Sequence, residues 1–254
     1  EDGKRDRSPS RGLGDVYKRQ VLGTFNLMSH GMEHWHPNPD FFYQPGGGPI
    51  LDLGPYYLGN LIHLIGPISR VTAFSSTPEK ERTITSEERF GETIPVNTPT
   101  TIQALLQFDN GALVTLGASW DVWDHGHPHM ELYGTKGTLR IPDPNIFSGV
   151  LQISARDGGF DPVPKWDHPF GIENEEYDSG WLANYRSAGL ADLVRAIHEG
   201  REARCHIQRP LHTVEVMTAI LQSAETGKVI ELETTCTRPD SLSPEEARTL
   251  INPR

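Results

Sequence analysis

The chain has 254 residues, of which 36% are hydrophobic and 22% charged, and its formal net charge is −11. This length suits one large domain or two small ones, and the periodic spacing of the apolar residues argues against a disordered chain. A nucleic-acid or anionic-membrane surface needs clustered Lys and Arg, so the acidic balance favours a small or neutral partner.

The two cysteines, Cys205 and Cys236, form no CxxC motif, so neither a disulfide framework nor a thiolate metal site is indicated. No apolar run approaches the ~20 residues that span a bilayer. The first twenty residues also lack the apolar segment of a secretion signal. We therefore expect a cytoplasmic protein with reduced cysteines and no membrane contact.

Residues 1–20 differ from the rest of the chain because they have no apolar periodicity. The segment LGDVYKRQ resembles the translated adapter sequence found at the broken ends of genes assembled from environmental DNA. We expect residues 1–20 to be foreign to the natural protein, the alternative being a disordered basic arm. The folded domain is then expected over residues 21–235, with a tail over residues 236–254 that carries a short helix.

The first half of the expected domain begins with a strand over residues 21–30 and a loop rich in His, Pro and Gly over residues 31–48. The segment PILDLGPYYLGNLIHLI, residues 49–65, predicts a helix that ends at Gly66-Pro67.

A series of strands follows. The strongest short-range hairpin signal is Asp109-Asn110-Gly111 between two alternating segments. Strands are predicted over residues 68–76, 100–108, 112–120, 129–133, 138–141 and 150–155.

The last part of the chain begins with a polar, Pro- and Gly-rich loop over residues 156–180, which is long enough to suspect function or disorder. Two amphipathic helices are predicted next, over residues 181–199 and 210–225, followed by a short strand over residues 229–232. The apolar stripe of the first helix consists of Leu182, Leu190, Leu193, Val194 and Ile197.

These elements predict an α+β fold in which a single open sheet carries all its long helices on one face. The uncovered face should associate with another copy, so we expect a homo-oligomer. A dinucleotide fold needs GxGxxG between a strand and a helix, whereas the only glycine cluster, Gly46–Gly48, lies between a loop and a helix. The chain alone is therefore expected to bind neither NAD nor NADP.

The predicted helix over residues 49–65 carries the most chemistry. If Pro49 opens this helix, Asp52, Tyr56, Asn60 and His63 follow at spacings of four, four and three and share one face. A carboxylate and a phenol beneath a Gly-rich turn suit proton transfer to a substrate hydroxyl or carbonyl, with Tyr56 as the acid or base and Asp52 as the orienting group. The alternative is that Asp52 only stabilises the helix N-terminus and Tyr56 only packs.

Two histidine-rich segments suggest ligand binding. His125, His127 and His129 alternate, and with Glu131 they approach the HxHxxxE spacing of a cupin metal site. Pro128 interrupts the ladder, and no later His completes the set in register, so we expect no metal.

The other segment lies in the loop before the glycines. Trp35 beside His36 is a common way to hold a sugar, because the indole stacks on its CH face and the imidazole bonds a hydroxyl. His30 and His34 are expected at the surface.

Three segments together resemble one protein family. They read SHGMEHWHPNPDFFYQPGGGPILDLGPYYLGNLIHLIGPISRVTAFS, then SWDVWDHGHPHMELYGTKGTLRIPDPNIF, then NYRSAGLADLVRAIHEGREARCHIQRPLHTVEVMTAILQSAETGKVIEL. In this order they are similar to the second domain of the Gfo/Idh/MocA oxidoreductases. The resemblance implies an open, mostly antiparallel sheet with helices on one face. It also implies an N-terminal Rossmann domain that binds NAD or NADP and carries a catalytic Lys in a Glu-Lys-Pro motif.

The resemblance also assigns roles within the segment Asp52-Leu53-Gly54-Pro55-Tyr56. The family's DxGxH motif supplies an Asp and a His to the substrate site. Asp52 matches the Asp, while Tyr56 stands in place of the His, as in some branches of the family. Asp52 and Tyr56 are therefore the expected catalytic residues. Trp35 and His36, from their residue types, and Asn60 and His63, from their place on the polar helical face, are the expected substrate-binding residues.

The Rossmann domain and its Lys have no counterpart in this sequence, so we expect a truncated gene product that is inactive alone. The expected parent enzyme transfers a hydride between a sugar or polyol and NAD or NADP. The alternatives are a non-catalytic sheet module that associates with itself and a cupin-like metal enzyme.

Overall fold

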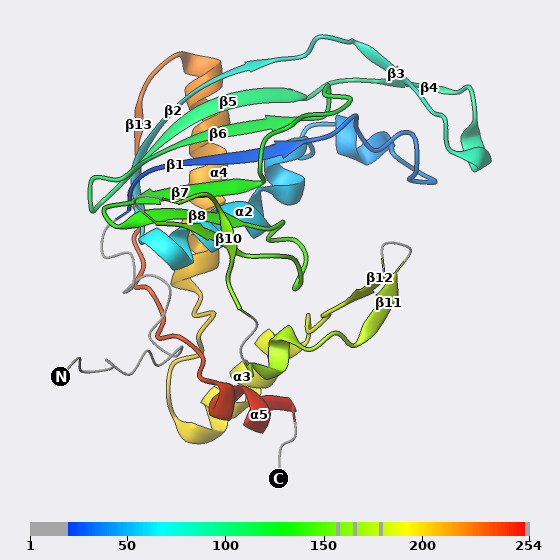
Figure 1. Cartoon of the computed structure of the whole chain (residues 1–254). Helices are drawn as coiled ribbons and strands as arrows, with labels where there is room; N and C mark the ends of the chain where they lie inside the picture. The colour runs from blue at the N-terminus through cyan, green and yellow to red at the C-terminus, as the bar shows by residue number, and fades with distance from the viewer. Residues whose placement is uncertain (1–19, 156–157, 165–166, 178–179, 252–254) are drawn as a thin grey trace, which may run out of the picture.

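The computed structural model describes residues 20–155, 158–164, 167–177 and 180–251, so the expectation for residues 1–19 lies outside the described residues. The largest sheet in this part of the chain has nine strands in the order β10-β9-β8-β7-β1-β6-β5-β2-β13 (Figure 1). These strands are β1 (Gln20–Met28), β2 (Ile68–Ser76), β5 (Thr101–Phe108), β6 (Leu113–Ser119), β7 (Met130–Gly134), β8 (Gly137–Ile141), β9 (Gln152–Ser154), β10 (Asp161–Pro162) and β13 (Ile230–Glu231).

Neighbouring strands run antiparallel except for β1 and β6, which are parallel. Two long helices, α2 (Pro49–Ile65) and α4 (Gln208–Thr226), lie along one face of the sheet (Figure 1). This arrangement confirms the predicted α+β fold with an open, mostly antiparallel sheet. None of the described helices is long and apolar enough to cross a bilayer.

The hairpin between β5 and β6 forms where the Asp-Asn-Gly signal predicts it. Gly111 adopts a positive φ of 86°, and the Asn110 side chain accepts a hydrogen bond from the Ala112 amide at 3.0 Å. Both features are what a tight turn requires of these two residue types. The turn fixes the register so that Leu106 pairs with Val114, and both side chains point to the helix-covered face.

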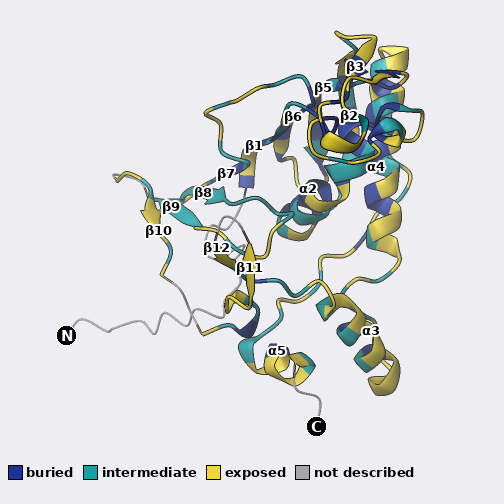
Figure 2. Cartoon of the chain, turned by 90° about the vertical axis from the view of Figure 1, so that its right-hand side faces the viewer, coloured by how far each residue is buried: buried dark blue, intermediate teal, exposed yellow. Residues whose placement is uncertain are grey.

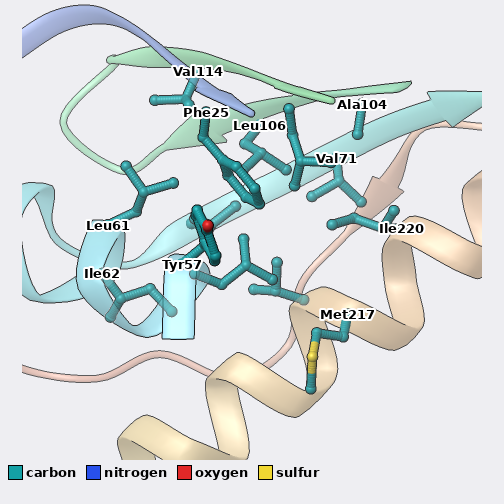
Figure 3. Close-up of a cluster of buried hydrophobic side chains, with 14 of the residues drawn as sticks. Phe25, Tyr57, Leu61, Ile62, Val71, Ala104, Leu106, Val114, Met217 and Ile220 are labelled. Carbon is teal, nitrogen blue, oxygen red and sulfur yellow. The ribbon is translucent and has the colours of Figure 1, made fainter. Parts of the chain in front are cut away.

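The main core lies between this face of the sheet and the two helices. Helix α2 places Tyr57, Leu58, Leu61 and Ile62 against it, because residues at these spacings share one helical face. The facing side chains of the sheet and α4 are shown in Figure 3 and include Phe25, Val71, Leu106, Val114, Met217 and Ile220. The two helices approach closely at Gly54, where a Cβ atom would lie 3.1 Å from the Met217 sulfur.

A second buried cluster supports the loop before α2. It includes Met32, Tyr43 and Trp120, together with Ile84 and Ile94. Ile94 lies on β4 (Thr93–Pro95), and Ile84 directly follows β3 (Glu81–Thr83), with which β4 forms a small sheet. Arg82 is buried within this cluster and pairs with Glu33 at 3.2 Å and with Asp121.

The segment before the third helix departs from the sequence prediction. Residues 180–182 form strand β12 (Gly180–Leu182), which pairs with β11 (Glu175–Tyr177), so α3 (Ala188–Glu199) begins later than predicted. The predicted loop over residues 156–180 also contains β10, a 3-10 turn η3 (Pro169–Gly171) and β11. The pairing of β11 with β12 outweighs the weak helical periodicity of this part of the sequence.

Helix α3 packs away from the sheet, next to α5 (Pro244–Ile251), so the expectation that all long helices lie on one face of the sheet is wrong for this helix. Its outer surface is largely exposed (Figure 2). The face turned inward carries Asp192, which accepts hydrogen bonds from Arg201 at 2.8 Å and from Arg204 at 2.9 Å. The predicted apolar stripe therefore points outward, and Ile197 is 74% exposed.

Candidate functional site

The turn that leads into α2 is built by glycines. Gly48 has a φ of 90°, and a Cβ atom on Gly47 would lie 2.4 Å from the Phe42 carbonyl oxygen. The Gly47 amide donates to the Gln44 carbonyl and the Gly48 amide to the Phe42 carbonyl, each at 2.8 Å. Because its own loop uses these amides, the turn does not fit the phosphates of a dinucleotide.

Four polar side chains of α2 lie on the side opposite the core. At 100° per residue, Asp52, Tyr56, Asn60 and His63 fall within an arc of about 80°. Tyr56 is 41% exposed. The structure thus brings these four residues onto one face, as their spacing predicts, while their catalytic and binding roles stay predictions.

Asp52 is half-buried in the first turn of α2. Burial raises the pKa of its carboxyl group above the ordinary value. Within the described residues no hydrogen bond or ion pair engages this carboxylate. A partly desolvated carboxylate without a partner is well suited to accept a hydrogen bond from a ligand hydroxyl.

The neighbouring Tyr57 has a different environment and was not among the predicted site residues. Its ring stacks on Phe25 with a centroid distance of 4.9 Å. Its hydroxyl donates to Asp143 Oδ1 at 3.0 Å and lies 3.3 Å from His129 Nδ1. Burial, reinforced by the Asp143 carboxylate, raises the pKa of the Tyr57 phenol. Tyr57 is only 3% exposed, so the accessible phenol of the pair is Tyr56.

A cation also lies near this face. The guanidinium carbon of Arg186 is 5.8 Å from the centroid of the Tyr56 ring. Arg186 Nη2 donates to the Asn145 carbonyl at 2.9 Å and is 3.3 Å from Asn145 Oδ1. No local pattern marks Arg186 or Asn145 in the sequence, because only the folded chain places them beside α2.

A cavity of about 400 Å³ lies between α2 and α4. Its lining includes Gly59 and His63 from α2, and Arg209, Thr213 and Met217 from α4. Desolvation beside this cavity, and then the positive charges of Arg238 and Arg209, lower the pKa of the His63 imidazole, although part of the side chain is exposed. These effects favour the neutral form of His63, which can both donate and accept a hydrogen bond.

The structure does not join Trp35 and His36 to the polar face of α2. Trp35 is 57% exposed and meets the His36 ring edge to face at 5.3 Å. The His36 ring packs on Phe41 and Phe42. No hydrogen bond or ring contact of Trp35 or His36 among the described residues reaches Asp52 or Tyr56. Their binding role stays a prediction for a separate place on the loop.

The alternating histidines do not converge. The His125 and His127 rings stack with centroids 6.2 Å apart, whereas His129 turns toward Tyr57. Glu131 pairs with Arg140 at 2.6 Å. Across the described residues no group of three or more His, Cys, Asp or Glu is placed to hold a metal ion.

His30 and His34, in the loop region before the glycines, were expected at the surface. His34 is exposed, but the half-buried His30 stacks on the Trp123 ring at 3.3 Å. The alternation of residues in the predicted strand does not indicate Trp123 as a partner of His30, because Trp123 lies on the loop after β6.

Comparison with solved structures shows the same fold in several oxidoreductases. An NAD binding oxidoreductase from Klebsiella pneumoniae is 22% identical with a TM-score of 0.67, over 89% of this chain and 64% of that one. Levoglucosan dehydrogenase in complex with NADH and L-sorbose is 20% identical with a TM-score of 0.65, over 86% of this chain and 60% of that one. An aldose-aldose oxidoreductase from Caulobacter crescentus, complexed with glycerol, is 21% identical with a TM-score of 0.60, over 85% and 57%.

The chain thus spans less than two thirds of the length of these structures. A search of curated proteins gave no match. A family model described as the GFO/IDH/MocA C-terminal domain matches residues 11–140, which include β1, α2 and the strands through β7. The chain therefore belongs to the Gfo/Idh/MocA family.

Proposed function

We propose that this chain forms the substrate-binding part of an NAD(P)-dependent oxidoreductase that acts on a CH–OH group of a sugar or polyol. The observation that carries the proposal is the pairing, one helical turn apart, of an accessible phenol at Tyr56 with a half-buried carboxylate at Asp52 that has no partner among the described residues. The names of the similar structures, levoglucosan dehydrogenase and aldose-aldose oxidoreductase, support a carbohydrate substrate.

Each residue of the polar face has a role in this proposal. Tyr56 exchanges a proton with the substrate hydroxyl, and Asp52 accepts a hydrogen bond that orients this hydroxyl. Asn60 and His63 bind neighbouring hydroxyl groups, since a neutral amide and a neutral imidazole both donate and accept hydrogen bonds. The glycine turn before α2 is not the site of the dinucleotide phosphates in this proposal, because its own loop uses the Gly47 and Gly48 amides.

Ligand binding to the purified chain tests this proposal. Calorimetry or ligand-observed NMR with levoglucosan, L-sorbose, glucose and inositol should detect at least one ligand. The Asp52→Asn variant should weaken its binding roughly 10-fold to 100-fold, because a hydrogen bond to a charged group is lost. Tyr133→Phe alters a phenol that bonds Glu131 in the sheet, and it should leave the Kd unchanged. Absence of binding to every member of the panel, and to glucuronate and glucose 6-phosphate as well, would refute the proposal.

We also propose that the uncovered face of the sheet forms a homo-oligomer. Leu22 pairs with Leu113 across β1 and β6, and Leu105 lies on β5 close to Leu113. These leucines point away from the helices and are exposed, as is Phe74 on β2, which is 77% exposed. Exposed large apolar side chains gathered on a regular sheet face, with Thr and Gln residues between them, favour association with a second copy over permanent exposure to water.

A further inference from the structure

The arginines of this acidic chain are mostly neutralised by carboxylates. Among the described residues, ion pairs within 4.0 Å involve Arg70, Arg82, Arg89, Arg140, Arg195, Arg201, Arg204 and Arg248. Arg186, like Arg209 and Arg238, has no such partner among these residues, although the net charge of the chain is −11. Its hydrogen bonds go to a neutral group, Asn145, and not to a carboxylate.

Arg186 is nevertheless held in a defined position. Asp143 Oδ1 accepts hydrogen bonds from the Asn145 amide at 2.9 Å and from the Tyr57 hydroxyl at 3.0 Å. Asn145 in turn holds Arg186 Nη2. A continuous chain of hydrogen bonds therefore connects the buried side of α2 to a guanidinium group that lies 5.8 Å from the Tyr56 ring.

The remaining donors of Arg186 are free for a ligand. Its hydrogen bonds within the described residues all use Nη2, which leaves Nε and Nη1 to donate. Each of these two groups can donate one hydrogen bond to an oxygen of a carboxylate or phosphate, and such bonds are strengthened by the positive charge of the guanidinium. Because the guanidinium carbon lies 5.8 Å from the centroid of the Tyr56 ring, one monosaccharide-sized molecule can contact both side chains.

We infer that Arg186 is a specificity-determining residue that binds an anionic group, carboxylate or phosphate, on the sugar whose hydroxyl meets Tyr56. The inference rests on the proposed function, because it assumes a sugar on the polar face of α2. It names the substrate class more narrowly: an acidic sugar such as a uronate or a sugar phosphate. Since the overall charge of the chain repels anions, selective anion binding has to come from a local group such as Arg186.

Binding of glucuronate, glucose 6-phosphate and glucose to the purified chain at low ionic strength tests the inference. At least one anionic sugar should bind about tenfold or more tightly than glucose, and which one does so separates carboxylate from phosphate recognition. Arg186→Gln should remove this preference without changing the Kd for glucose. Arg186→Lys should keep part of it, because the charge remains but the separate Nε and Nη1 donors are lost.

Arg195→Gln is the matched control, because Arg195 lies on α3 and pairs with Glu199 instead of facing α2. It should keep the full preference. Equal binding of glucose and both anionic sugars would overturn the inference while leaving the proposed function intact. An anion preference that survives Arg186→Gln would also overturn the inference. A loss of glucose binding in that variant would overturn it too, because it would indicate a purely structural role for Arg186. Absence of binding for all three sugars, together with a negative result for the neutral panel, would overturn both proposals.

Discussion

The phenol of Tyr57 donates a hydrogen bond to the carboxylate of Asp143 at 3.0 Å, although 86 positions separate the two residues in the sequence. The bond ties the buried side of α2 to the loop that follows β8. Tyr56, the next residue back along the helix, lies 100° away around the helix axis and is accessible. Two adjacent tyrosines thus have different expected contributions, the buried one to stability and the accessible one to binding and catalysis.

Replacement of the buried tyrosine should cost stability. Tyr57→Phe keeps the stacking on Phe25 but removes the hydrogen bond to Asp143, so the free energy of unfolding should fall by about 1 kcal/mol. Chemical denaturation followed by circular dichroism measures this change. Tyr56→Phe is the matched control, and its unfolding free energy should stay within about 0.5 kcal/mol of the wild type. The assignment is wrong if Tyr56→Phe is the more damaging of the two changes.

Replacement of the accessible tyrosine should cost turnover instead. In an enzyme that joins this chain to a dinucleotide-binding domain, Tyr56→Phe should lower kcat by about 10²-fold to 10⁴-fold, the usual contribution of a general acid or base. Asp52→Asn should also lower kcat, and the double variant should lose less than the product of the single losses, because the two groups act on one hydroxyl. Steady-state kinetics with an unchanged kcat for Tyr56→Phe would leave Tyr56 as a packing residue.

The sign of a pH effect distinguishes the two interpretations of Asp52. Burial raises the pKa of its carboxyl group, so the folded state favours the protonated form. The contribution of Asp52 protonation to the free energy of unfolding is then fully present at low pH, and it is lost as the pH rises through the pKa of Asp52 in the folded state. Asp52→Asn removes this titration, so the variant should gain stability relative to the wild type as the pH increases from about 3 to about 6.

Denaturant titrations of both proteins across this pH range measure the difference, and the other titrating groups cancel in the comparison. A relative stability of Asp52→Asn that falls with rising pH would show the opposite pKa shift. That result would support the alternative in which the carboxylate mainly stabilises the positive end of the helix dipole.

The loop before α2 should depend on one buried cation. Arg82→Ala leaves Glu33 buried without its ion pair, and the free energy of unfolding should fall by about 3–5 kcal/mol. Arg70→Ala removes an exposed pair with Glu231 and should cost no more than about 1 kcal/mol. Thermal or chemical unfolding of both variants gives the comparison. Similar losses would mean that the buried pair contributes no more than a surface pair.

The parts of the fold that follow from the sequence are those with strong local signals. The hairpin at Asp109-Asn110-Gly111 and the helix between Pro49 and Gly66 combine turn chemistry with clear periodicity, and the structure confirms both. The predicted start of α3, at residue 181, was wrong because the local pairing of β11 with β12 outweighs a helical periodicity that continues through residues 181–187. The polar face of α2 could be predicted because all four residues lie on one helix.

The rest of the candidate site could not be predicted from local pattern. Tyr57, Asp143 and Arg186 come together only through long-range packing of α2, the loop after β8 and the segment before α3. None of them lies in a spacing that is typical of a site. The alternation of His125, His127 and His129 suggested a shared strand face, but β7 begins only at Met130, so the loop is free to direct these rings elsewhere.

The uncovered sheet face should control the oligomeric state. Leu105→Lys places a charge within the patch formed by Leu22, Leu105 and Leu113, and a buried unpaired charge is costly. The dissociation constant of the oligomer should therefore rise by at least about tenfold, which analytical ultracentrifugation can measure. Leu190→Lys on α3 is the matched control, since Leu190 is also an exposed leucine but lies on the helix that packs away from the sheet. Dissociation caused by Leu190→Lys and not by Leu105→Lys would move the interface from the sheet to α3, because a lysine disrupts association only where the interface buries it.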